Sequence, residues 1–188
     1  MKPFLFLFIF LFSTGSIFAQ GCIPYITLQS QAEVDNLPNL FPDCTEIEFD
    51  LQIGASNTPT DIHDLTPLLL LEKVNRNIYI RDNPLLTSLA GLDNLQEVGE
   101  IFSIGTGTPI ENFQGLNRLK TLERFSCSSP ALQSLEGLDS LHTVYLFSIG
   151  QSSLLSNFSN FPPHLDTIPL LFIGSLPNVT DLSGLVSR

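Results

Sequence analysis

Basic residues are scarce in this sequence. Its 188 residues include 8 lysines and arginines against 19 aspartates and glutamates, a formal net charge of −11 at pH 7. A field of that sign repels the phosphates of nucleic acids and the surfaces of anionic membranes, so we expect no nucleic-acid partner. Charged residues of both signs make up only 14% of the chain, which favours a surface of hydroxyl and amide groups over one of ion pairs.

The motifs of common catalytic sites are missing too. The sequence holds no Gly-rich phosphate loop, no nucleophile elbow and no cluster of cysteines and histidines. Its histidines, His63, His142 and His164, share no metal-ligand spacing. Some parallel β-helices are polysaccharide lyases or hydrolases, but those enzymes need basic residues or paired carboxylates in a groove. Because lysine and arginine are scattered here, we expect a protein that is not an enzyme and carries no cofactor or metal.

The longest apolar run lies at the N-terminus, between Phe4 and Phe12. It is shorter than the roughly 20 residues that span a bilayer, so the sequence predicts no transmembrane segment. Lys2 before the run and the small Ala19 after it are typical of a secretory signal peptide, residues 1–19. The remaining residues, 20–188, hold seven basic and nineteen acidic side chains, a formal charge of −12. We predict that they are secreted and work outside the cell or at the cell surface.

Cysteine is rare as well, with Cys22, Cys44 and Cys127. In an exported protein the first two predict a disulfide that closes a local loop and contributes about 3 kcal/mol. Lipid attachment at Cys22 is the alternative, since Gly21-Cys22 ends as bacterial lipoprotein sites do. Those sites favour Leu where Ala19 stands, and lipidation would leave Cys44 without that partner.

The clearest positive feature of the sequence is an internal repeat. The phrase from Ser88 to Leu95 returns from Ser134 to Leu141, with weaker copies elsewhere. Each copy has a Gly or Asn anchor, and successive anchors are 22 to 24 residues apart, a period typical of a stacked solenoid. Both residue types tolerate positive φ, so we expect a tight corner at each anchor: Gly91, Gly115, Gly137, Asn160 and Gly184.

A short β-like run precedes each anchor. Side chains alternate across a strand, so one column is expected to point into the stack: Ile53, Ile80, Ile104, Cys127, Ile149 and Ile173. Cys127 stands where its neighbours have isoleucine, which predicts a buried free thiol rather than a nucleophile. Proline recurs after the strands and fixes φ where the chain leaves the sheet: Pro84, Pro109, Pro130 and Pro177. These patterns predict a mainly β fold, a right-handed parallel β-solenoid over residues 45–188.

Residues 20–44 are expected to form a disulfide-closed N-terminal cap. Ser30 and Glu33 have the spacing of a helix capping box. Ala32, Val34 and Leu37 offer an apolar side, so we predict a short helix over about 30–37 that lies on the first coil. The last repeat stops partway without a cap, and we expect it to be frayed, covered by a partner or continued in a longer protein.

The first strand of the solenoid is expected to alternate strictly, with Ile47, Phe49 and Leu51 inward and Glu46, Glu48 and Asp50 outward. Three carboxylates on one face are able to bind calcium, but the Gly turn of a calcium loop is absent. A charged strand that discourages edge-to-edge pairing is the favoured interpretation.

A resemblance becomes specific at this point. Cys22, the segment Cys44-Thr45-Glu46-Ile47 and the segment from Asn83-Pro84 to Gly91-Leu92 resemble the receptor L-domain-like, leucine-rich-repeat-like repeats of secreted bacterial surface proteins. The L domains of growth-factor receptors are more distantly similar. The resemblance covers residues 22–188 and implies binding or adhesion, with no catalytic residues to transfer. Such proteins often continue into further repeats and a C-terminal anchoring segment, which is not found here.

Two outward columns of the sheet contain the candidate binding residues. The first column is expected to hold Tyr79, Ser103, Ser126, Ser148 and Phe172, and the second Asn77, Ile101, Arg124, Leu146 and Leu170. Exposed apolar side chains in such columns are typical of a binding face, which makes the candidates Tyr79, Ile101, Arg124, Leu146, Leu170 and Phe172. A register slip of one residue would exchange the two faces, and a covering loop or domain is the other alternative.

The sequence therefore predicts a non-enzymatic recognition or adhesion module that binds an extracellular protein or glycan through its sheet face. A structural spacer within a larger surface protein is the alternative, and a carbohydrate-active β-helix enzyme is a third reading.

Overall fold

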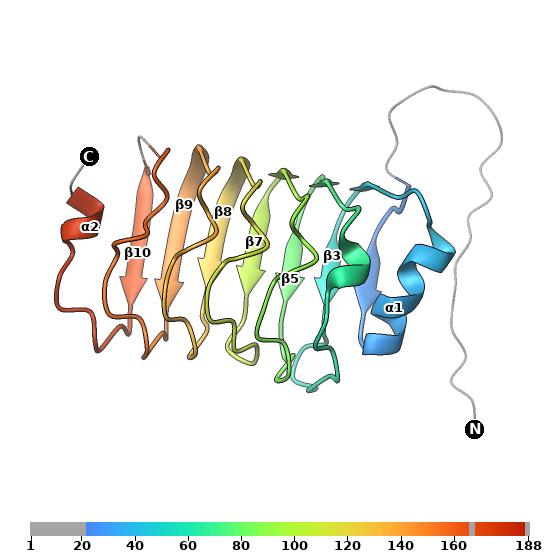
Figure 1. Ribbon diagram of the computed structural model, residues 1–188, viewed down its shortest axis with the longest axis horizontal. Coiled ribbons are helices and arrows are strands. Elements are labelled where there is room, and N and C mark those ends of the chain that lie inside the picture. Colours follow the sequence, from blue (N-terminus) through green and yellow to red (C-terminus); the bar gives the residue numbers. More distant parts are fainter. Residues whose placement is uncertain (1–21, 166–167, 187–188) are drawn as a thin grey trace.

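The computed structural model describes residues 22–165 and 168–186, so the predicted signal peptide lies outside the described residues (Figure 1). The chain winds into a parallel β-solenoid, which confirms the predicted fold class. One long row of parallel strands runs through the stack in the order β1 (Ile26–Leu28), β3 (Leu51–Ile53), β5 (Ile78–Ile80), β7 (Ile101–Ile104), β8 (Thr121–Cys127), β9 (Thr143–Gly150) and β10 (Leu170–Gly174).

The strand register agrees with the predicted columns. The backbone pairs Ile53 with Ile80, and the same column continues through Ile104, Cys127 and Ile149 to Ile173. The first five of these side chains are buried. β-Branched and aromatic residues suit this pleated, half-buried surface, which explains why the strands form at these positions.

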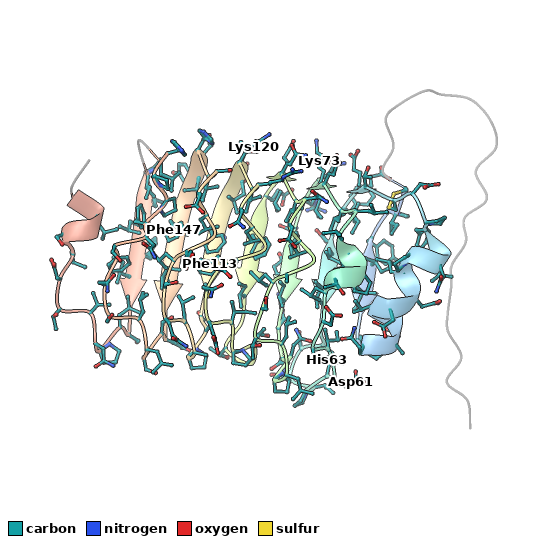
Figure 2. The ribbon with its side chains drawn as sticks, in the orientation of Figure 1. Asp61, His63, Lys73, Phe113, Lys120 and Phe147 are labelled. Atoms are coloured by element: carbon teal, nitrogen blue, oxygen red, sulfur yellow. A yellow bond between two sulfur atoms is a disulfide. The ribbon has the colours of Figure 1, made fainter. Side chains whose placement is uncertain are left out.

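Stacked phenylalanine rings fill the middle of the stack. Phe125 lies between Phe102 and Phe147, with ring centroids 5.6 and 5.1 Å away and nearly parallel planes. Phe113 comes from the opposite side of a coil and packs edge-on against Phe125 at 5.0 Å. Figure 2 shows Phe113 and Phe147 inside the coils. Offset and edge-on contacts of this kind add to the free energy gained by burying each ring.

A second, shorter row of strands precedes the long row. It contains β2 (Glu46–Ile47), β4 (Lys73–Val74) and β6 (Glu97–Val98), and it continues into the first residues of β8 and β9. In the earlier coils a bend separates the strand of the short row from the strand of the long row. The inward residues on the two sides of this corner are four positions apart, as in Ile47 and Leu51. In β8 and β9 they are three apart, as in Leu122 and Phe125, and the two rows merge into one continuous strand.

Because of this corner, the predicted orientation of the Phe49 side chain is wrong. Phe49 was expected to point inward, but it lies in the bend between β2 and β3 and is 42% exposed. Strict alternation assumes one unbroken strand, and the bend between Ile47 and Leu51 breaks it. Ile47 and Leu51 themselves are buried as predicted.

The N-terminal cap is the helix α1 (Gln31–Leu40), which covers the first coil as predicted and extends beyond the expected end, through Pro38. Its N-cap Ser30 accepts a hydrogen bond at Oγ from the Glu33 backbone N–H at 3.3 Å. The buried face consists of Gln31, Val34 and Leu37, while Ala32 is exposed. The prediction for Ala32 is wrong because residues three apart share a helix face, and Ala32 is offset from that row.

Gln31 fastens the cap helix to the first coil through its side-chain amide. Its Oε1 accepts hydrogen bonds from the backbone N–H groups of His63 and Asp64, at 2.9 and 3.0 Å. Its Nε2 donates to the Asp64 carbonyl at 3.0 Å and to Asp35 Oδ1 at 2.8 Å. The buried amide therefore satisfies backbone groups that would otherwise lose their partners on burial.

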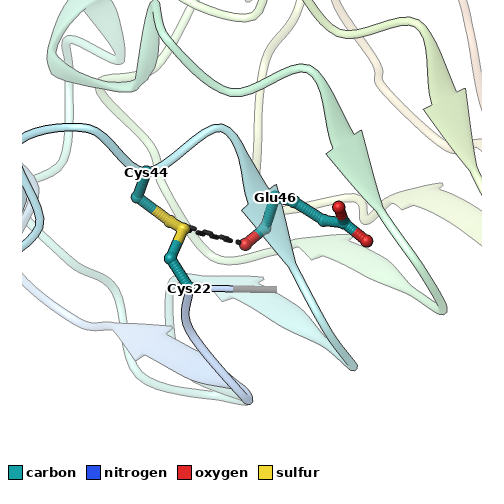
Figure 3. The surroundings of a disulfide bond; sticks show 3 residues. All are labelled: Cys22, Cys44 and Glu46. Carbon is teal, nitrogen blue, oxygen red and sulfur yellow. Dashed lines mark hydrogen bonds between the residues drawn. A yellow bond between two sulfur atoms is a disulfide. The ribbon is translucent and has the colours of Figure 1, made fainter. Parts of the chain in front are cut away.

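The structure contains the predicted disulfide. Cys22 and Cys44 are bonded, with Cα atoms 5.6 Å apart, and the bond lies beside the Glu46 carbonyl of β2 (Figure 3). The Cys22 backbone N–H donates to that carbonyl at 3.1 Å. The disulfide therefore ties the loop that contains β1 and α1 to the first coil.

The predicted tight corners are confirmed at three anchors. Gly91, Gly115 and Gly137 have φ values of +109°, +104° and +107°. Asn160 and Gly184 also lie in tight turns, closed by the hydrogen bonds of Phe161 N–H to the Phe158 carbonyl and of Leu185 N–H to the Leu182 carbonyl. Neither of the two residues has positive φ. Gly184 lies in the helical turn α2 (Ser183–Val186), where dihedrals are right-handed.

The last described strand differs from the others in exposure. Every residue of β10 is exposed, and Ile173 is 37% exposed where Ile149, its partner in β9, is 1% exposed. β10 pairs with β9 alone among the described strands, so its inward side chains are covered on one side only. None of the described helices is both long and apolar enough to cross a lipid bilayer.

Candidate functional site

The outer sheet face is the surface formed by the outward side chains of the long strand row. Its central column is held in register by the backbone ladder and reads Gln52, Tyr79, Ser103, Ser126, Ser148 and Phe172. The aromatic members therefore point outward as predicted, and the alternative of a register slip is wrong. Tyr79 is half-buried among its neighbours and Phe172 is 55% exposed.

A second column runs along the start of the same strands. It pairs Ile101 with Arg124, Arg124 with Leu146, and Leu146 with Leu170. Ile101 and Leu146 are half-buried, whereas Arg124 and Leu170 are exposed. The structure thus brings four of the six candidate residues into one row on adjacent strands, about 4.8 Å apart, beside the column that contains Tyr79 and Phe172.

Asn77 occupies the same column one strand earlier but is buried. Its backbone N–H and Nδ2 both donate to Asp50 Oδ1, at 3.2 and 2.7 Å. The exposed part of this column therefore begins at Ile101.

The basic side chains on and near the outer sheet face differ in their contacts. Arg81 lies over the Tyr79 ring, with its guanidinium carbon 4.6 Å from the ring centroid. The ion pairs among the described residues are Lys73 with Glu97 and Arg76 with Glu100, both at 3.0 Å. Arg124 takes part in neither of these pairs, and its side chain is exposed.

Tyr145 is a surface residue that sequence reasoning missed. It lies next to Leu146 in β9 and is 60% exposed. The three-residue corner of β9 points two consecutive side chains outward, which widens the outer sheet face with an aromatic ring. The shortened spacing between Val144 and Phe147 was the signal that could have revealed it.

Two carboxylates of the acidic first strand hold side chains of the next coil. Glu46 Oε1 accepts from Asn75 Nδ2 at 2.8 Å, and Asp50 Oδ1 accepts from Asn77. These two carboxylates therefore bind amides of the next coil. In the described part of the chain, no three His, Cys, Asp or Glu side chains gather in an arrangement able to hold a metal ion.

Cys127 is fully buried in the inward column and unpaired. Burial raises the pKa of its thiol from 9.0 to about 12, although a backbone hydrogen bond from Ser129 partly opposes the shift. The thiolate is the reactive form of cysteine, so the side chain acts as a small apolar group at neutral pH.

Sequence reasoning also missed a local turn that recurs from coil to coil. At the same place in each coil, a short polar side chain accepts a hydrogen bond from the backbone N–H two residues later. The pairs are Asp64 with Thr66, Ser88 with Ala90, Asn112 with Gln114, Ser134 with Glu136, Asn157 with Ser159, and Asp181 with Ser183. These are Asx and Ser/Thr turns, and they open the repeated phrase in each coil.

The apolar cleft between α1 and the short helical turn η1 (Thr66–Leu68) has a volume of about 30 Å³. That volume holds about one water molecule. The cleft is too small for an organic ligand, so it is not a candidate functional site.

Comparisons with known proteins give no further guide to this site. No protein-family model, no curated protein and no solved structure matches this chain.

Proposed function

We propose that the protein is a non-enzymatic recognition or adhesion module that works outside the cell and binds an extracellular protein or glycan across its outer sheet face. The observation that carries the proposal is the row of large apolar side chains held outward on adjacent strands. Leu170 and Phe172 are 39% and 55% exposed, and Leu146 lies beside them in β9. Contiguous exposed apolar surface of this kind usually belongs to an interaction site.

The composition of the face also supports recognition. Aromatic residues and arginine are enriched at protein interfaces, while other charged residues are depleted at their centres. The outer sheet face follows this pattern, with Tyr79, Tyr145 and Phe172 beside Arg124 and the serine hydroxyls of the central column. Aromatic rings next to hydroxyl groups suit a sugar chain as well as a peptide.

The predicted signal peptide and the disulfide together support export. Disulfides persist in oxidising compartments and are rare in the cytosol, and Cys22 and Cys44 are bonded. The resemblance to receptor L-domain-like repeats points to the same compartment and to binding.

A binding screen tests the proposal. Purified residues 20–188 would be screened against a glycan array and a panel of extracellular proteins, beside the double variant Tyr79→Asp/Phe172→Asp. Leu85→Asp is the matched control because Leu85 is 59% exposed but lies outside the strands. Circular dichroism would confirm that each variant is folded.

We expect affinity to fall at least about tenfold in the double variant, the loss typical of a well-packed interface residue, and to stay unchanged in the control. Equal binding by a folded double variant would disprove the role of this face. If no ligand binds any of the proteins, the spacer interpretation is favoured instead.

A further inference from the structure

Two histidines that are far apart in the sequence lie face to face in the structure. The rings of His142 and His164 stack with centroids 5.1 Å apart and an angle of 8° between their planes. They belong to successive coils, since His142 directly precedes β9 and His164 follows in the next coil. Both residues are exposed. We propose that this pair binds one divalent transition-metal ion of the kind that prefers imidazole, such as Zn²⁺.

The tautomer of His142 suits a metal ligand. Its Nδ1 lies within hydrogen-bond distance of the Ser140 carbonyl oxygen, which has no proton to donate. Nδ1 therefore carries the proton, and the lone pair of the neutral ring is on Nε2. Histidine ligands of metals commonly donate their other ring N–H to a carbonyl or carboxylate in this way.

Metal binding requires the two rings to turn out of their stacked arrangement. Two imidazole nitrogens that share a tetrahedral zinc ion lie about 3.3 Å apart, given Zn–N bonds of about 2.0–2.1 Å. Imidazole lone pairs lie in the ring plane, so parallel rings with centroids 5.1 Å apart must rotate about their side-chain torsions before both lone pairs point at one ion. Exposed side chains change rotamer readily, so the backbone keeps its register.

The neighbouring positive charge is directed away from the pair. The His142 backbone N–H donates to the Lys120 carbonyl at 2.9 Å, so Lys120 stands one coil earlier in the same column. Its ammonium group donates to Gln96 Oε1 at 3.1 Å, in the coil before it, whereas His142 belongs to the coil after it. The formal charge of residues 20–188 is −12, which favours a cation over an anion at this surface.

Two imidazoles supply half of a tetrahedral coordination shell, and water completes it. Because His142 and His164 come from successive coils, the bound ion links one coil to the next. This linkage is useful at the C-terminal end, where the strand β10 that follows His164 is exposed throughout. Metal binding to the folded chain raises its stability by mass action.

The histidine pair is tested by Zn²⁺ titration calorimetry on untagged residues 20–188, with Mg²⁺ as a control ion. The variants His142→Gln and His164→Gln remove one ring each. Gln is a tolerated choice at 142, because Gln96 holds the same column in an earlier coil. His63→Gln is the matched control, since His63 Nδ1 lies 2.9 Å from the Asp61 carbonyl, a local contact like that of His142 with Ser140.

We expect one Zn²⁺ to bind per chain, with no heat from Mg²⁺. Loss of either ring of the pair should weaken Zn²⁺ binding by about tenfold or more, as disturbance of a metal site typically does, while His63→Gln binds like the wild type. In a melting experiment, Zn²⁺ should raise the Tm of the wild type and of His63→Gln alone. A wild type that binds no Zn²⁺, or pair variants that bind as tightly as the wild type, would overturn the proposal.

Discussion

Gly115 passes so close to Leu89 of the preceding coil that a β-carbon on Gly115 would lie 2.2 Å from the Leu89 carbonyl oxygen. No real side chain tolerates that distance, and the φ of +104° at Gly115 adds a second requirement for glycine. The same close approach recurs at Gly91 against Leu65 and at Gly137 against Phe113. Contact of backbone with backbone therefore sets the separation of the coils along this side of the stack.

Gly115→Ala should lower the free energy of unfolding by about 2–4 kcal/mol, since it combines a left-handed backbone with a steric clash. Urea denaturation measures the loss. Gly174→Ala is the matched control, because no atom lies within 4 Å of its β-carbon position and its φ lies outside the left-handed region. Equal stability of the two variants would show that the coils adjust their spacing freely.

Replacing both cysteines of the disulfide, as Cys22→Ser/Cys44→Ser, should lower the free energy of unfolding by about 3 kcal/mol. The bond closes a loop with a sequence separation of 22, and chain-entropy arguments give that value for a loop of this size. Denaturation of the oxidised wild type and the double variant in the same buffer measures the difference. An unchanged midpoint would mean that the loop is ordered in the unfolded chain without the bond.

Gln31→Ala should destabilise the protein by about 1–3 kcal/mol. The substitution leaves the part-buried backbone N–H groups of His63 and Asp64 without their acceptor, and each such hydrogen bond contributes about 0.5–1.5 kcal/mol net. Hydrogen exchange should show faster opening at both amides. Gln29→Ala, at an exposed position just before the helix, is the control and should change neither measurement.

The buried thiol of Cys127 predicts how stability depends on alkaline pH. The pKa of the folded thiol is about 12, against an ordinary value of 9.0. Between these values the unfolded chain releases a proton that the folded chain keeps. The free energy of unfolding therefore falls as the pH rises from about 9 towards 12, by about 1.4 kcal/mol per pH unit, and is unaffected by this group below pH 9.

Comparison with Cys127→Val isolates that contribution, because other side chains titrate in the same range. For each pH unit above 9, the free energy of unfolding of the wild type should fall further relative to that of Cys127→Val. A difference that is constant from pH 8 to pH 11 would mean that the thiol is accessible in the folded state. The folded wild type should also react with thiol reagents only after denaturation.

Much of the fold could be predicted because the same pattern of apolar strand residues and corner glycines recurs in successive coils. The isoleucine column that contains Cys127 followed from strand alternation, and the corners at Gly91, Gly115 and Gly137 followed from glycine at a fixed period. The errors lie where one coil departs from the pattern. Phe49 points outward because a bend interrupts its strand, and the turns at Asn160 and Gly184 form without positive φ.

The candidate site was only partly visible in the sequence. The outward columns with Tyr79, Arg124 and Phe172 followed from the register, but the exposure of Tyr145 depends on one residue missing from a corner. His142 and His164 were judged by linear spacing, which hides residues one coil apart. In a solenoid, residues about one coil period apart lie close together, and the sequence separation of 22 between His142 and His164 falls within the period of 22 to 24.

The disulfide has a consequence for the response of the chain to mechanical force. Tension that enters the backbone ahead of Cys22 passes through the sulfur atoms to Cys44, so β1 and α1 inside that loop carry none of it. Beyond Cys44 the tension acts on the coils. Neighbouring strands are joined by three residue pairs between β3 and β5, but by six between β8 and β9. A stretched molecule should therefore lengthen first by unwinding the coils whose strands share few residue pairs. The loop closed by the disulfide stays unextended.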